Sequence, residues 1–180
     1  HPVLFYLFLQ TFFGALAAAF FNFNVWTPLF KGAGLSDAGF GYVWTLGSIL
    51  GIVTPIWAAS LLKKTGEKRL LMITFILLIV QMILVIFSHS LFVLVCLLIF
   101  GYAVLDFQNP IWGVFLHKHI SNKLRASVGS VNGMIISLSF IIGSPIAGYV
   151  IDNFGPRLAP VFSIGFTFIS LLLISRIKGK

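Results

Sequence analysis

One acidic residue, Asp106, lies deep inside a long apolar stretch. A charged side chain at the middle of a bilayer costs roughly 3 kcal/mol on insertion scales, so such a residue usually faces protein or a water-filled cavity. At 100° per residue, Tyr102, Asp106 and Asn109 share one helix face with Gly113 and His117. The pattern predicts a cavity wall on which Asp106 binds a proton or anchors a cationic group. The alternative is a structural Asp that hydrogen-bonds a neighbouring helix.

A second polar face is predicted near the start of the chain. Gln10, Gly14 and Asn24 lie within about 40° of one another on a helix, and Asn22 lies close to them. We predict that the side-chain amides of the Gln and Asn residues hydrogen-bond a small solute. The alternative is hydrogen bonding between helices, which averages about 0.6 kcal/mol in one membrane protein.

Other kinds of chemistry have little support in the sequence. No pair of His or Cys residues has metal-ligand spacing, and the single cysteine, Cys96, lies inside an apolar stretch. The apolar stretches offer no paired acid and no His–Ser arrangement. We therefore expect no metal, no cofactor and no enzymatic activity.

Six apolar stretches of near membrane-spanning length must position these residues. The chain is 59% hydrophobic and only 9% charged, whereas soluble domains carry about 25% charged residues. The predicted fold is an all-α membrane protein with one six-helix domain over residues 1–180. Its predicted spans cover residues 3–30, 40–62, 70–87, 91–116, 126–151 and 158–174.

The positive charge is distributed unevenly between the loops. Ten Lys and Arg residues lie on one side of the predicted spans and only Lys31 and Arg157 on the other. By the positive-inside rule, both chain ends are predicted in the cytoplasm. The net charge of +8 therefore reflects basic loops on one side of a membrane protein, whose partner is the lipid bilayer. No nucleic-acid partner is expected.

Two segments that end the second and fifth predicted spans resemble each other. Gly66 and Gly155 each follow a predicted helix end, and they are 89 residues apart, as are Lys68 and Arg157. Three spans per unit is an odd number, so the two units would lie inverted in the membrane. This similarity predicts an inverted three-plus-three repeat of the kind found in many secondary transporters.

The segment from Ala59 to Arg69 resembles the loop between the second and third helices in half of a major facilitator superfamily transporter. The residues Leu61, Lys64, Gly66 and Lys68 match its pattern, whereas Lys63 replaces an Asp that latches the cytoplasmic side in the family. The resemblance implies a conformational role for Lys64, Gly66, Lys68 and Arg69.

Two further segments support the same resemblance. The segment that begins at Arg125 resembles the start of the eleventh helix, and Gly143, Pro145 and Gly148 resemble a Gly-Pro motif, with Ser144 inserted. The resemblance implies that the chain corresponds to helices seven to twelve and pairs with an N-terminal six-helix half. The chain begins His1-Pro2, which suggests a piece cut from something longer. By this resemblance the first and fourth spans line the central cavity, and both polar faces fall on them.

Small residues predict close helix packing. Gly47 with Gly51, and Gly129 with Gly133, form two G-x-x-x-G patterns, at which helix backbones can approach closely. We expect packing seams at both.

The expected function is secondary active transport of a small organic solute by alternating access, in a plasma membrane such as the bacterial inner membrane. Proton-coupled export of a lipophilic, drug-like compound is favoured, because the interior is aromatic-rich and contains one embedded acid. Uptake of a monocarboxylate or sugar is the alternative within the same fold. A six-span scaffold or sensor that transports nothing is the alternative from another class.

Overall fold

The computed structural model describes residues 2–21 and 23–177, which form helices and turns and no strand. The helices are α1 (Pro2–Phe20), α2 (Phe23–Gly32), α3 (Asp37–Thr65), α4 (Glu67–Phe87), α5 (Leu91–Lys118), α6 (Arg125–Phe154) and α7 (Ala159–Arg176), with a short 3₁₀ turn at Asn122–Leu124. Six helical stretches are long and apolar enough to cross a bilayer, with α1 and α2 counted as one. The predicted all-α class with six membrane-length helices is confirmed.

The first predicted span is divided into two helices. The helix α1 ends at Phe20, where the Phe21 amide is shared between the carbonyls of Ala17 and Ala18 at 3.0 and 3.2 Å, and α2 begins at Phe23. The span predicted over residues 3–30 corresponds to one membrane-length stretch, Val3–Gly32, that consists of two helices. The predicted site residue Asn22 lies outside the described residues.

Local signals in the sequence explain where α3 and α6 end. Gly66 and Gly155 follow these helices with φ of 82° and 85°, a region that side chains with a Cβ rarely adopt. Each glycine amide bonds the carbonyl four residues earlier, Leu62 at 3.2 Å and Ile151 at 2.9 Å. At its start α3 is capped by the Ser36 hydroxyl, which accepts a hydrogen bond from the Gly39 amide.

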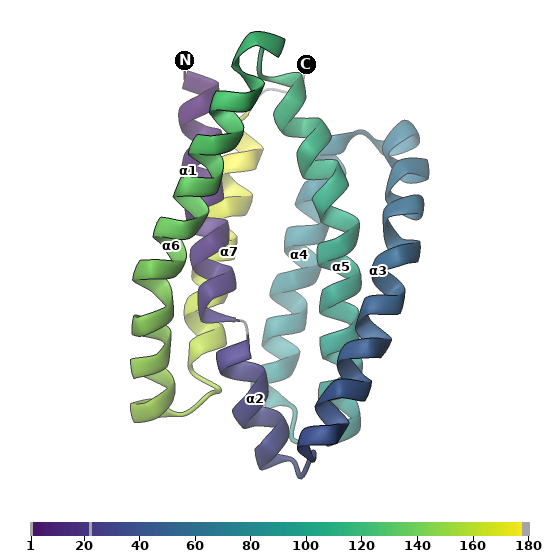
Figure 1. The fold of residues 1–180 in the computed structure, drawn as a ribbon, viewed down its shortest axis with the longest axis vertical. Helices are drawn as coiled ribbons and strands as arrows, with labels where there is room; N and C mark the ends of the chain where they lie inside the picture. The colour runs from purple at the N-terminus through teal and green to yellow at the C-terminus, as the bar shows by residue number, and fades with distance from the viewer. Residues whose placement is uncertain (1, 22, 178–180) are drawn as a thin grey trace.

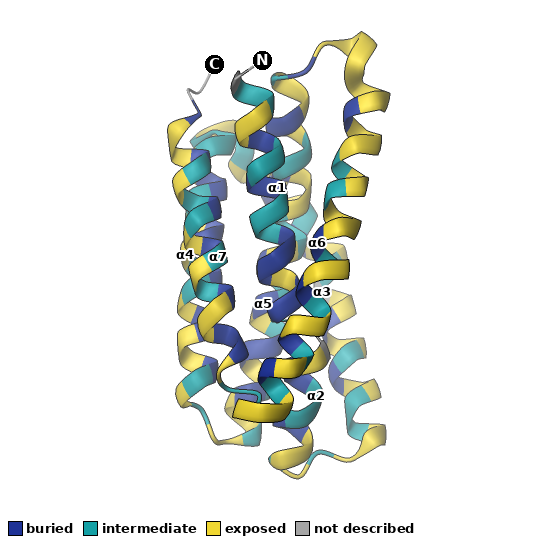
Figure 2. Cartoon of the chain, turned by 90° about the vertical axis from the view of Figure 1, so that its left-hand side faces the viewer, coloured by how far each residue is buried: buried dark blue, intermediate teal, exposed yellow. Residues whose placement is uncertain are grey.

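The helices pack as two groups of three spans, with α3, α5 and α4 in one group and α7, α1 and α6 in the other. The main contacts follow the order α3, α5, α4, α7, α1 and α6, so α4 and α7 join the groups (Figure 1). Both termini lie at one end of the bundle, and α2 lies at the other. Exposed residues cover the outward faces of the helices, whereas α1 is rich in buried residues (Figure 2). In this order α1 takes the place equivalent to α5, α3 the place equivalent to α6, and α4 the place equivalent to α7. The inverted repeat itself stays a prediction.

Two basic side chains tie α4 to α7, one at each end of the bundle. Lys68 Nζ donates hydrogen bonds to the carbonyls of Ser175 and Ile177, at 2.8 and 2.7 Å, where α7 ends. Arg157 Nη1 donates to the carbonyls of Val85 and Ile86, at 3.2 and 2.8 Å, where α4 ends. The last carbonyls of a helix lack their usual partners, so each cation supplies a donor there, although the Val85 carbonyl also accepts from the Ser88 amide at 3.3 Å.

Replacing Lys68 with Met tests the contribution of this cap. The Met side chain keeps a similar length but donates no hydrogen bond, so two carbonyls at the end of α7 lose their partner. We expect the free energy of unfolding to fall by about 1 kcal/mol, measured by thermal unfolding in detergent. Lys64→Met is the matched control, since Lys64 is exposed. Equal unfolding temperatures for the two variants would contradict the role of the cap.

The orientation predicted from the basic loops is tested by cysteine labelling. Single cysteines at Lys64 and Lys123 should react with a membrane-impermeant maleimide only from the cytoplasm, and those at Lys31 and Asn153 only from outside. Labelling of positions 64 and 123 from opposite sides would refute the six-span arrangement.

Candidate functional site

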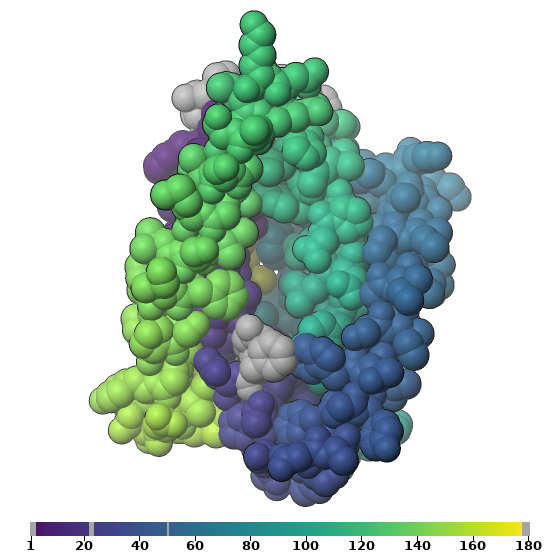
Figure 3. Space-filling view, in the orientation of Figure 1, coloured from purple at the N-terminus to yellow at the C-terminus, as the bar shows by residue number. Residues whose placement is uncertain are grey.

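A cavity of about 310 Å³ lies between α1, α4, α5, α6 and α7. In the space-filling view the surface is hollowed between α5 and α6, and atoms of α7 are visible at the back (Figure 3). The volume is at the lower end of the range for small-molecule pockets, about 300–1,000 Å³.

The apolar core leaves space for this cavity because it is divided into two large clusters. One cluster includes Trp26 and Phe30 on α2, and the other includes Leu7 and Ile174 near the chain termini. Only a small cluster around Leu78 lies apart from both, and Leu78 lines the cavity. The two large clusters therefore hold the ends of the bundle while the middle remains partly open.

Three of the predicted site residues line the cavity together: Gln10 of α1 and Tyr102 and Asn109 of α5. Gln10 is buried, and Asn109 is exposed. Two others do not line it, namely Asp106 and Asn24, and Asn24 is an exposed residue of α2. The grouping of the two polar faces around one cavity is thus only partial.

Asp106 faces α3. A Cβ added to Gly51 would lie 2.8 Å from Asp106 Oδ2, and a Cβ added to Gly47 would lie 3.3 Å from Tyr102 Cδ2. Gly47 and Gly51 are four residues apart on α3, as are Tyr102 and Asp106 on α5. Each glycine therefore leaves space for one of these two side chains. Within the described part of the chain, Asp106 forms no ion pair. The face of α5 that lines the cavity is therefore turned about the helix axis, by roughly a quarter turn, from the face that was predicted to be polar.

Several cavity residues were missed by the sequence analysis. All are polar and uncharged: Thr11, Gln81, Gln108, Asn132 and Thr167. The Thr11 hydroxyl donates to Asn132 Oδ1 at 2.7 Å, which links α1 to α6. Gln81 stands out in the sequence as an isolated polar residue in an apolar span, and this is the signal that could have identified it.

The cavity lining is uncharged. No Asp, Glu, Lys, Arg or His lines the cavity among the residues that the structure describes, and apolar surface dominates it. Its aromatic members are Phe21, Trp26, Phe75, Tyr102, Trp112 and Phe140. Because a buried charge without a partner is costly, this lining suits an uncharged molecule with aromatic or aliphatic surface.

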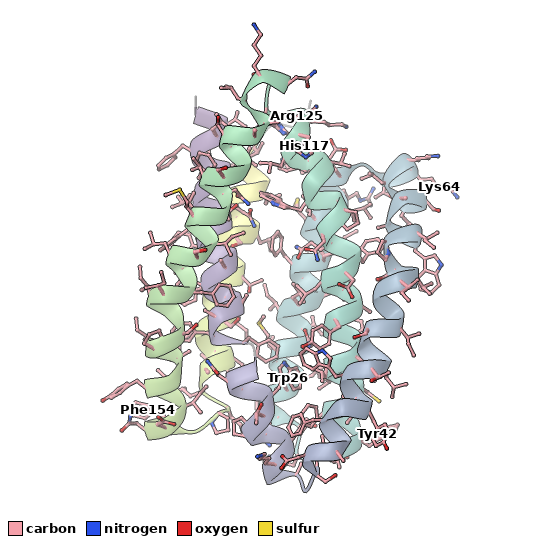
Figure 4. The ribbon with its side chains drawn as sticks, in the orientation of Figure 1. Trp26, Tyr42, Lys64, His117, Arg125 and Phe154 are labelled. Carbon is pink, nitrogen blue, oxygen red and sulfur yellow. The ribbon has the colours of Figure 1, made fainter. Side chains whose placement is uncertain are left out.

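Trp26 borders both this cavity and a second one. The second cavity, of about 330 Å³, is almost entirely apolar and lies between α2, α3 and α5. Trp26 and Leu98 line both cavities. Trp26 lies between α2 and α5 (Figure 4), and its ring centroid is 5.2 Å from that of Phe21 and 5.5 Å from that of Phe30. It therefore lies at the boundary of the two cavities.

The predicted conformational loop lies away from the cavity. Lys64 and Arg125 are exposed and lie at the same end of the bundle as His117 (Figure 4), and Arg69 is also exposed. Lys68 differs from these because it caps α7.

A salt bridge beside this loop links α4 to α5. Glu67 Oε1 accepts a hydrogen bond from Lys118 Nζ at 2.7 Å, and the Glu67 side chain is only 12% exposed. This hydrogen bond lowers the pKa of the Glu67 carboxyl, which precedes the apolar part of α4. The pair keeps the beginning of α4 close to the end of α5.

The small residues divide into a close-packed set and an open set. Gly143 of α6 faces α1, where an added Cβ would lie 2.8 Å from Ala19 Cβ and 3.1 Å from Leu16 Cδ2. By contrast, a Cβ at Gly129, Gly133 or Gly148 would meet nothing within 4 Å, and Pro145 is exposed. A seam within this chain is thus found at Gly143, while the side of α6 that carries Gly129 and Gly133 is open.

The model of the Major Facilitator Superfamily matches residues 2–178. The chain belongs to this family. A search of curated proteins found no match. Members of the superfamily are secondary transporters rather than enzymes, which agrees with a multi-pass membrane protein whose helices surround an uncharged cavity.

Replacing Gly143 with Ala tests the contact of α6 with α1. The added methyl group would overlap Ala19, and separating the helices should lower the free energy of unfolding by about 1–3 kcal/mol, measured by thermal unfolding in detergent. Gly148→Ala is the control on the same helix, because its Cβ has free space. Adding Ala19→Gly to Gly143→Ala should restore stability. A destabilisation that persists in this double variant would count against the contact.

Proposed function

We propose that this chain is the C-terminal six-helix half of a proton-coupled transporter that moves a small, uncharged, moderately lipophilic organic compound by alternating access. The observation that carries the proposal is the uncharged cavity, in which neutral amides and hydroxyls alternate with aromatic rings. The favoured direction is export from a cell across its plasma membrane, such as the bacterial inner membrane, with both chain ends in the cytoplasm.

The open side of the bundle supports pairing with an N-terminal half. The membrane-length windows of α3 and α6 are only 18% and 22% buried within this chain, compared with 44% for α4. Gly129 and Gly133 lie on an uncovered side of α6, where a second helix could approach closely. In this proposal the N-terminal half covers that side and completes the central cavity.

The division of the first span supports alternating access. Discontinuous helices line the substrate sites of many secondary transporters. Here the interruption after α1 lies beside the cavity, and Trp26 on the following helix lines both this cavity and the second one. In this proposal α2 moves relative to α1, and the displacement of Trp26 opens the cavity toward the outside.

Asp106 is the proposed proton site. It is the acidic residue embedded in the spans, and it lies against Gly51 in the contact of α3 with α5. Protonation would remove the charge from this contact and change how the two helices pack. The proton would then act on a helix contact beside the cavity, whereas the solute would bind within it.

Among the alternatives, the geometry disfavours a monocarboxylate. An anionic solute needs a cation or a cluster of donors aimed at it, and no Lys or Arg lines the cavity among the described residues. A sugar is compatible with the neutral polar groups but makes less use of the aromatic ones.

A transport assay on the full-length protein tests the proposal. Proteoliposomes with an imposed pH gradient are given radiolabelled chloramphenicol, glucose or benzenesulfonate, which represent an uncharged amphiphile, a sugar and a permanently ionised anion. We expect accumulation of chloramphenicol driven by the gradient. In Asp106→Asn this accumulation should be abolished while downhill exchange persists, because Asn keeps the shape but binds no proton.

The control is Asp37→Asn, the same chemical change at an exposed residue that pairs with Lys31 at 3.2 Å. It should transport as the unmodified protein does. Normal pH-driven accumulation by Asp106→Asn would remove Asp106 from the mechanism. Accumulation of benzenesulfonate in place of chloramphenicol would contradict the uncharged substrate.

A further inference from the structure

Two buried polar side chains lie where α4 meets α7, at the back of the cavity. Gln81 of α4 and Thr167 of α7 both line the cavity, and each is only 2% exposed. Gln81 Nε2 donates to the Leu97 carbonyl at 2.9 Å, but Gln81 Oε1 and Thr167 Oγ1 have no partner among the described residues. Buried polar atoms are nearly always hydrogen-bonded, so these two need an explanation.

A third unpaired atom belongs to the same cavity. Gln10 of α1 is 6% exposed, and its Oε1 also has no partner among the described residues. The three side chains come from three helices and from both three-span groups. Such convergence on one cavity sets them apart from isolated polar residues that bond their own helix.

The surrounding glycines hold the two amides close to the cavity wall. A Cβ added to Gly101 would overlap the Gln81 amide, and a Cβ added to Gly14 would lie 3.4 Å from Gln10 Nε2. Both glycines line the cavity. Each glutamine amide therefore lies beside a glycine of the cavity wall, in space that a larger residue would fill.

We infer that Gln81 and Thr167, with Gln10, form a hydrogen-bond-accepting subsite for an uncharged donor group of the solute, a hydroxyl or an amide N–H. This inference rests on the proposed function, because it assigns the solute that the cavity binds. Each unpaired oxygen is covered but has free lone pairs, so it can accept such a donor once its side chain turns toward the cavity. Among the described residues no carboxylate lines the cavity, so an ammonium group would lack a counter-charge there. The solute is then an uncharged molecule with an apolar, aromatic-sized body and at least one neutral donor.

The subsite also links binding to the arrangement of the helices. A donor held by Gln81 on one side and by Thr167 or Gln10 on the other connects the two three-span groups through the solute. Because α4 and α7 already join these groups, the bound molecule reinforces the existing contact.

A pair of probes that differ only in one donor tests the subsite. Binding of 2-naphthol and 2-methoxynaphthalene to the purified full-length protein in detergent is measured by quenching of tryptophan fluorescence. Both have the same rings, but only naphthol donates a hydrogen bond. We expect naphthol to bind about fivefold more tightly, the factor that one net hydrogen bond typically gives.

Variants then locate the preference. Thr167→Val and Gln81→Met each remove an acceptor with little change in volume, so naphthol should lose most of its advantage while methoxynaphthalene binds as before. Thr74→Val is the control, since Thr74 is equally buried on α4 but its hydroxyl is bonded to the Leu71 carbonyl and does not line the cavity. If Gln81→Met binds neither probe, Thr167→Val decides the outcome.

Two results would overturn the inference. If ordered water satisfies the three oxygens permanently, the two probes bind with equal affinity to the unmodified protein. If the donor is recognised elsewhere, the preference for naphthol survives in both variants. These outcomes are independent of transport, because binding is measured without a gradient. A protein that transports chloramphenicol but shows no donor preference would retain the proposed function and lose the subsite.

Discussion

The contact between α4 and α7 is the interaction on which the other features of the bundle depend. It joins the two three-span groups, and at each end a cation caps carbonyls at the end of the opposite helix: Lys68, in the first turn of α4, caps α7, and Arg157, just before α7, caps α4. Backbone groups that enter hydrocarbon must find partners within the protein, so these caps allow the helices to end close together at the membrane surface. The cavity lies in front of this contact, and Gln81 and Thr167 form part of its back wall.

Much of the fold could be predicted from the sequence, because apolar length and loop chemistry are local signals. Gly66 and Gly155 were identified as helix ends, and both have the positive φ that this position requires. The 89-residue spacing that relates Lys68 to Arg157 also relates Ser175 to Ile86, whose carbonyls these cations bond. The interruption after Phe20 could not be predicted. Its sequence, Phe20-Phe21-Asn22-Phe23-Asn24, contains no Gly or Pro, and the apolar pattern continues across it.

The candidate site was harder to predict because it is assembled across helices. Helical periodicity correctly places Tyr102 and Asn109 on one side of α5, but it does not determine which neighbour that side meets. The glycines of α3 create the space that receives Asp106, and this space depends on how α3 packs against α5. Gln81 and Thr167 have no periodic polar partner on their own helices. Only the contact of α4 with α7 brings them to the same cavity.

The separation of Asp106 from the cavity lining bears on how a proton and a solute would be coupled. If both bound at the same atoms, the proton and the solute would compete for them. A desolvated carboxylate on the cavity wall is also costly, whether or not the solute has a neutral group that can donate to it. A titratable group in the contact of α3 with α5 avoids this conflict, because it can change the packing around the cavity without entering it. The neutral lining and the displaced acid are therefore two consequences of one physical requirement in the proposed mechanism.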